Sequence, residues 1–199
     1  MSSNITSDFS TLVGSRICHD LISPVGAINN GLELLGMSNT LEGPELELIS
    51  DSVNNANARI RFFRIAFGAA GDQDLGRAEI MSVLADLNKG GRVKYTWSVT
   101  DASRRSSVRL AFLAGLSLET ALPYGGTVEI SNSDGTWTVR GEGRKIAVDP
   151  ATWTGLLAVP PQEDLTPALV QFPLLSHGAQ SEGKEATFGH DETSVWISF

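Results

Sequence analysis

The sequence of 199 residues is poor in the residue types that hold metals or form disulfides. A single cysteine excludes a disulfide framework and a cysteine-based zinc site. The three histidines, His19, His177 and His190, show no HExxH spacing. We therefore expect no metal cofactor in this chain.

Basic residues and long apolar runs are also scarce. The 15 Lys and Arg against 23 Asp and Glu give a formal net charge of −8, which argues against broad binding to nucleic acid phosphates. No apolar run reaches the ~20 residues of a membrane span, and the N-terminus lacks the basic start and apolar stretch of a secretory signal. We expect a cytoplasmic protein that binds other proteins, with no nucleic acid and no membrane partner.

The first third of the sequence carries a heptad pattern. Residues 6–36 and 45–67 each read as one long helix, and a short link between them predicts an antiparallel hairpin. A hairpin of about 60 residues buries two apolar stripes poorly, so we predict that two copies pair into a four-helix bundle. The alternative is that the stripes pack on the rest of the same chain. The stripe residues are Cys18, Leu21, Val25, Ile28, Leu32 and Leu35, then Leu46, Ile49, Val53, Ala56, Ile60, Phe63 and Phe67.

The pattern changes after residue 70. Apolar and polar residues alternate over 93–99, which is typical of a half-buried strand, and residues 104–122 return to a helical spacing. Asp134-Gly135 predicts a hairpin turn between strands at 127–132 and 136–140. We therefore predict an α+β protein with a helical domain at 1–70 and a small α/β sandwich at 71–199.

His19 lies on the first helix but not on its apolar stripe. At ~100° per residue it falls about 150° from the centre of the stripe, so its side chain should point to solvent. The neighbours on its face have little bulk, which would let another protein approach the imidazole, and one is an exposed isoleucine that invites contact. The bland alternative is an ordinary surface histidine. These neighbours are Ser15, Ile22, Ser23, Gly26 and Asn30.

The segment His19-Asp20-Leu21-Ile22-Ser23-Pro24-Val25 resembles the H-box of sensor histidine kinases. Residues 18–31, 61–68 and 121–126 are more similar still to the ChpT family of alphaproteobacterial histidine phosphotransferases. The resemblance implies a dimeric four-helix bundle that is phosphorylated on His19, with Asp20 orienting the ring or acting on a proton. It also implies that the second half is a degenerate Bergerat-like domain, related to the ATP-binding domain of the kinases.

The second half lacks the residues of a working ATP site. The helix at 110–122, which should carry magnesium-binding asparagines, contains none, and the D-x-G-x-G motif is missing. The nearest string, Gly141-Glu142-Gly143, reads as a turn. A triphosphate needs metal ligands and backbone donors around it, so we predict no ATP binding and no cofactor in this chain. Magnesium is expected only in a partner receiver.

The resemblance implies a phosphotransfer protein without autokinase activity. Phospho-His19 would relay phosphoryl groups between receiver domains, one of them in a hybrid histidine kinase. Folding the hairpin near residue 40 brings His19 level with Arg61, which could attract the phosphoryl group or simply solvate the bundle; Arg64 is the nearby alternative. The competing functions are a dead kinase-like module that only binds receivers, and an active kinase with a divergent nucleotide site.

Overall fold

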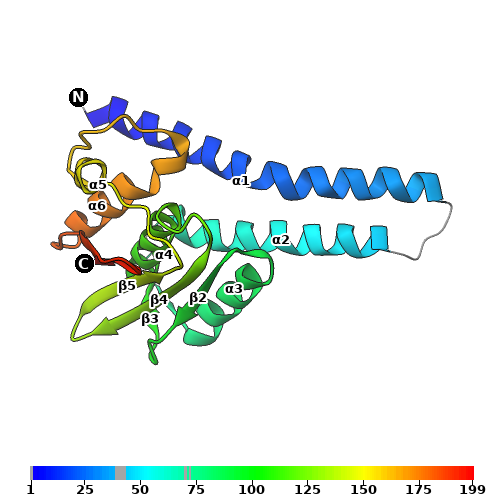
Figure 1. Ribbon diagram of the computed structural model, residues 1–199. Coiled ribbons are helices and arrows are strands. Elements are labelled where there is room, and N and C mark those ends of the chain that lie inside the picture. Colours follow the sequence, from blue (N-terminus) through cyan, green and yellow to red (C-terminus); the bar gives the residue numbers. More distant parts are fainter. Residues whose placement is uncertain (1, 39–43, 70, 72) are drawn as a thin grey trace.

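Two long antiparallel helices project from a mixed α/β half (Figure 1). The computed structural model describes residues 2–38, 44–69, 71 and 73–199, with side chains described from Phe9 onward except at 36–38. Helix α1 spans Ser2–Ser38 and contains Pro24, and helix α2 spans Pro44–Ala66. The axis of α1 bends along its length in Figure 1, the change of direction that a mid-helix proline favours. The predicted link at 39–43 lies outside the described residues.

The α/β half is built on a five-stranded sheet with the order β2-β4-β5-β7-β6. The β2–β4 pair is parallel and the other pairs are antiparallel. A separate short pair joins β1 to β3. The elements after α2 are β1 (Asp74–Leu75), α3 (Arg77–Gly90), β2 (Val93–Trp97), β3 (Ser103–Arg104), α4 (Arg105–Thr120), β4 (Gly126–Ser133), β5 (Thr136–Glu142), α5 (Pro150–Leu157), the 3-10 turn η1 (Pro167–Leu169), α6 (Gln171–Ser181), β6 (Thr187–His190) and β7 (Ser194–Ser198).

The turn between β4 and β5 follows from its two residues. Asp134 has a φ of 51° and Gly135 a φ of 84°, so both central residues adopt the left-handed conformation that a tight hairpin turn requires. The register then pairs Ser133 with Thr136, and the two strands continue in step to Thr127 and Glu142. The predicted hairpin is confirmed.

Helix α4 is the centre of the core. Its apolar side chains are buried on all sides because α2, α6 and the sheet surround it. Gly115 allows close packing, since a Cβ there would lie 2.6 Å from Cε1 of Tyr95. The ring of Phe112 stacks on that of Phe62 from α2, with centroids 4.4 Å apart and planes 5° from parallel. The base of the hairpin is therefore fixed to the α/β half by aromatic packing.

The two halves of the hairpin differ in what covers their apolar residues. Close to the α/β half, Phe62, Phe63, Ile65 and Ala66 are buried within the single chain. Further out, stripe residues such as Leu32 are exposed to 55%, although α1 and α2 lie so close that a Cβ on Gly31 would come within 2.5 Å of Cγ1 of Ile49. About half of the stripe residues are thus exposed in one chain, and most of the others are half-buried.

The predicted α+β class and the helical hairpin are confirmed, but one stripe assignment needs correction. Phe63 packs into the α/β core and is not available to a second copy. Cys18 is exposed in the single chain, like other outward residues of the stripe, and its place in a bundle core stays a prediction. The boundary at 70/71 stays a prediction, because the last turns of α2 bury their side chains in the second half. Among the described residues, no helix combines the length and the apolarity that crossing a bilayer requires.

Candidate phosphoacceptor site

The side chain of His19 stands out from the middle of α1. It is 83% exposed, as its helical phase predicts. The carboxylate of the next residue, Asp20, is only 11% exposed, so the two neighbours have opposite environments. Nδ1 of His19 lies 3.1 Å from Oδ1 of Asp20. The contact joins an accessible ring to a carboxylate that is held inside the hairpin junction.

Asp20 is held by arginines that the sequence analysis did not single out. Nε of Arg16 donates to Oδ2 of Asp20 at 2.9 Å, and Nη1 of Arg59 lies 4.0 Å from the same oxygen. The Arg16–Asp20 pair was recognisable as an i, i+4 pair of opposite charges on one helix. Arg59 comes from α2, so its approach depends on the pairing of the two helices and left no local signal.

The carboxylate determines which ring nitrogen can react. An ionised carboxylate only accepts hydrogen bonds, so the contact at 3.1 Å requires the proton on Nδ1 of His19. The lone pair of the neutral ring is then on Nε2, which is the nitrogen left for a nucleophilic attack. The arrangement supplies an oriented, exposed nitrogen nucleophile.

The small face predicted around His19 is present. Ile22 is 68% exposed, and a Cβ added at Gly26 would meet no atom within 4 Å. Ser15, Ser23 and Asn30 are also exposed. Among the described residues the imidazole is open on this side, at 83% exposure, and Ile22 gives the face an apolar centre.

Arg61 does not lie where the sequence analysis placed it. Its guanidinium is bound to α3, with Nη1 donating to Oδ2 of Asp86 and Nη2 donating to Oγ of Ser82 at 3.1 Å. The reason is helical phase: Arg59, two residues earlier, faces Asp20, whereas Arg61 is turned toward α3. Arg64 is exposed on α2, and its carbonyl accepts a hydrogen bond from Arg105 at 3.2 Å.

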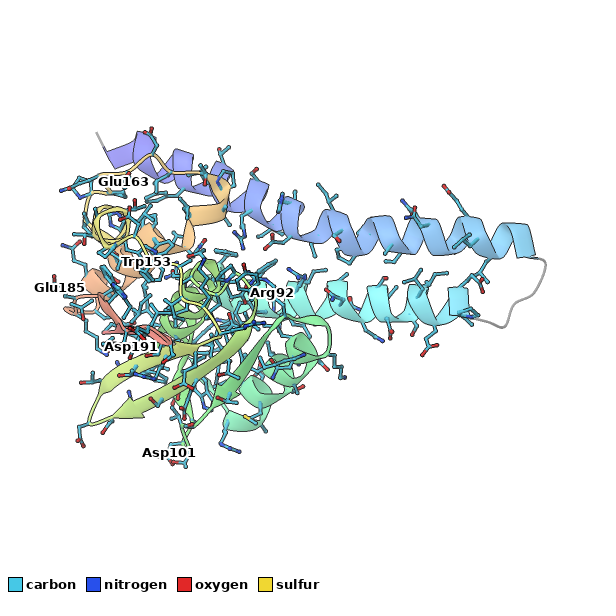
Figure 2. The ribbon with its side chains drawn as sticks, in the orientation of Figure 1. Arg92, Asp101, Trp153, Glu163, Glu185 and Asp191 are labelled. Carbon is cyan, nitrogen blue, oxygen red and sulfur yellow. The ribbon has the colours of Figure 1, made fainter. Side chains whose placement is uncertain are left out.

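Beneath Asp20 lies a pocket of about 330 Å³ between the hairpin and the α/β half. Its lining includes Arg16, Arg59, Arg92 and Glu119. Figure 2 shows Arg92 at this junction, where its guanidinium binds the carbonyls of Leu122 and Glu119.

Burial raises the pKa of the Glu119 carboxyl group, although Tyr95 donates a hydrogen bond to its Oε1 at 2.7 Å. Burial also raises the pKa of Tyr95 well above 10.

The region that resembles a nucleotide motif is used for structure. Gly141 and Glu142 belong to β5 and pair with Val128 and Thr127, so the string Gly141-Glu142-Gly143 is not the turn that the sequence suggested. The amide of Gly143 donates to the carbonyl of Thr193 at 3.1 Å. Sheet pairing therefore occupies backbone donors that a phosphate loop would present to a ligand. Within the described residues, no group of three or more His, Cys, Asp or Glu side chains is placed to hold a metal.

The hairpin thus presents an exposed histidine that is backed by a carboxylate, next to an α/β half. Residues 77–194 match the histidine phosphotransferase C-terminal domain. The chain is 37% identical over 150 residues to the protein phosphotransferase ChpT of Brucella abortus (strain 2308), an alignment that covers 72% of this chain and 71% of the relative. The chain belongs to the histidine phosphotransferase family.

A solved structure described as a bacterial phosphotransferase at 1.7 Å is similar over the whole chain. The two share 32% sequence identity and superpose with a TM-score of 0.77, which covers 96% of this chain and 95% of that one. The similarity therefore includes the hairpin as well as the α/β half. It agrees with the predicted family.

Proposed function

We propose that His19 carries the phosphoryl group in this histidine phosphotransferase and passes it between receiver domains of a phosphorelay. The observation that supports this role is the contact of Asp20 with Nδ1 of an imidazole that is otherwise 83% exposed. The ring is held in one tautomer and its other nitrogen is open to a partner. One of the partners is expected to be the receiver of a hybrid histidine kinase.

The transfer consists of two displacements. In the first, Nε2 of His19 attacks the phosphorus of a receiver aspartyl phosphate, the N–P bond forms, and the bond from phosphorus to the carboxylate oxygen breaks. The ring becomes cationic, and Asp20 stabilises the proton that remains on Nδ1. In the second, the aspartate of another receiver attacks the phosphorus and the N–P bond breaks. Magnesium is supplied by the acidic site of the receiver, so catalysis by this chain is mainly positioning.

The same proposal includes a homodimer and the absence of ATP chemistry. The exposed stripe on the outer hairpin supports pairing of two copies into a four-helix bundle, which would cover residues such as Val25, Leu32 and Ile60. We expect no saturable heat when magnesium-ATP is titrated to millimolar concentration by calorimetry. A micromolar dissociation constant would instead favour an active kinase with a divergent nucleotide site.

The decisive experiment compares wild type with His19→Ala. With a radiolabelled phosphorylated receiver, wild type should acquire an acid-labile, base-stable label, and the variant should acquire none. The melting temperature should stay the same, because an exposed side chain contributes no more than about 0.5 kcal/mol to stability. Ile22→Asp should weaken receiver docking and recover at high receiver concentration. If His19→Ala is labelled at the wild-type rate, the chain is a receiver-binding module without transfer.

A further inference from the structure

Arg16 makes two hydrogen bonds that connect distant parts of the chain. Its Nε donates to Oδ2 of Asp20 at 2.9 Å, and its Nη1 donates to the backbone carbonyl of Ala168 at 2.9 Å. Ala168 lies in η1, and Figure 1 shows the segment that leads into α6 running alongside the N-terminal half of α1. The side chain of Arg16 is 15% exposed; its bond to Asp20 is partly buried, whereas its bond to Ala168 lies at the exposed edge of the junction.

Arg16 is also the cation that holds Asp20 most closely. Arg59 reaches only to 4.0 Å, and its Nε is already bound to Oδ1 of Asn55 at 3.0 Å. A guanidinium presents several donors in one rigid plane, so a side chain fixed on the Ala168 carbonyl leaves Nε aimed in a defined direction. Arg16 thereby holds the Asp20 carboxylate through Oδ2, while the other oxygen, Oδ1, contacts His19.

We propose that Arg16 is a positioning residue for phosphotransfer: by binding Asp20 and the Ala168 carbonyl together, it fixes the carboxylate that keeps the proton on Nδ1 of His19. The proposal rests on the proposed role of His19. It gives the α/β half a part in the reaction that needs no nucleotide, because that half supplies the anchor for Arg16. The reactive Nε2 is then presented in one orientation from a helix that is otherwise open to solvent.

The test uses Arg16→Met, which keeps the apolar stem and removes both hydrogen bonds. Transfer from a phosphorylated receiver is measured in single turnovers over a range of receiver concentrations. We expect the rate at saturation to fall between about 10- and 100-fold, as for a misplaced reacting group, while the half-saturating receiver concentration stays the same. Arg16→Lys should restore part of the rate, because it keeps a cation near Asp20 but not the fixed fork.

The histidine tautomer gives a readout that a merely structural role would not change. With ¹⁵N-labelled histidine, the signal of His19 is identified by its loss in His19→Ala. In wild type it should report a proton on Nδ1, and in Arg16→Met it should shift toward the Nε2-protonated form. The matched control is Arg77→Met, since Nε of Arg77 also donates to a backbone carbonyl, that of Val99 at 3.2 Å. The control should leave tautomer and rate unchanged.

A double-mutant cycle decides whether Arg16 acts through Asp20. If it does, Arg16→Met combined with Asp20→Asn should transfer no more slowly than Asp20→Asn alone. Additive losses would overturn the proposal, and so would a slow Arg16→Met protein that keeps the wild-type tautomer. If wild type itself takes no label, the proposed function fails, and the tautomer measurement still decides whether Arg16 controls the ring.

Discussion

Helices α2 and α4 are both rich in apolar residues, but only α4 is covered along most of its length by its own chain, whereas α2 is covered mainly at its C-terminal end. On α4, Leu110, Leu113 and Leu118 are at most 1% exposed. On α2, Leu46, Val53 and Ile60 are exposed to between 38% and 49%. The difference shows that the α/β half completes its own core, whereas the outer hairpin presents an apolar surface that one chain leaves open. The predictions below test whether that surface is covered by a second copy.

The largest effect is expected from charges on the hairpin stripe. Leu32→Asp with Ile60→Asp would place four carboxylates in a dimeric bundle, and each buried charge costs several kcal/mol, so the dimer should dissociate. Light scattering at micromolar concentration should fall from about twice the 21.2 kDa chain mass to a single chain mass. Circular dichroism should show that the α/β half remains folded.

A matched control for this pair lies on another face of α1. Leu34 is 47% exposed, close to the 55% of Leu32, but it lies off the heptad stripe. Leu34→Asp should leave the dimer intact. If the dimer survives Leu32→Asp but dissociates with Leu34→Asp, the stripe assignment is wrong. If the wild-type protein is a monomer, the four-helix bundle does not form.

The next effect in size is expected in the core of the α/β half. Phe112→Ala removes a fully buried ring that stacks on Phe62, so the free energy of unfolding should fall by about 3–5 kcal/mol. Urea unfolding followed by tryptophan fluorescence measures the change. Leu48→Ala, on an exposed position of α2, serves as the control and should change stability by no more than about 0.5 kcal/mol. Equal losses in the two variants would contradict the contrast between α2 and α4.

The smallest effect is expected from Glu119, where the two halves meet. Burial raises the pKa of Glu119 in the folded state above the ordinary 4.5. The folded state therefore loses stability relative to the unfolded state as the pH rises from about 4.5 through the pKa of the folded state. Glu119→Gln removes this loss and can still accept the hydrogen bond of Tyr95. Its stability relative to wild type should therefore increase with pH across that range.

Urea midpoints measured at several pH values from 4 to 8 provide the test. The comparison protein is Glu185→Gln, which changes an exposed glutamate far from the junction (Figure 2). Its stability should follow that of wild type throughout. A difference between Glu119→Gln and wild type that does not vary with pH would mean that the carboxyl of Glu119 does not titrate differently on folding.

The hairpin could be predicted from the sequence almost to its ends because heptad spacing is a local property. The predicted helices at 6–36 and 45–67 correspond to Ser2–Ser38 and Pro44–Ala66. The phase of His19 could be predicted for the same reason. The pattern could not show what covers each position, so Phe63 was given to the bundle although the α/β core buries it.

The neighbours of the site were harder to predict than the site residue itself. Antiparallel alignment of the two helices predicted Arg61 beside His19, but Asp86 binds Arg61, and Asp86 lies on α3, outside the hairpin. Arg59 and Ala168 approach the site only through tertiary packing. A long-range partner leaves no spacing in the sequence, whereas the i, i+4 pair of Arg16 and Asp20 does.

One consequence follows from the continuity of α2. Ile60 belongs to the exposed stripe and Phe62 to the buried aromatic stack, so a single residue of α2 separates the proposed surface for a second copy from the anchor of the α/β half. Each residue of an α-helix turns the chain by about 100°. Inserting a single residue at 61 would therefore swing the whole α/β half by about that angle around the bundle. In the proposed dimer, the number of residues between Ile60 and Phe62 would set the angular placement of the two α/β halves.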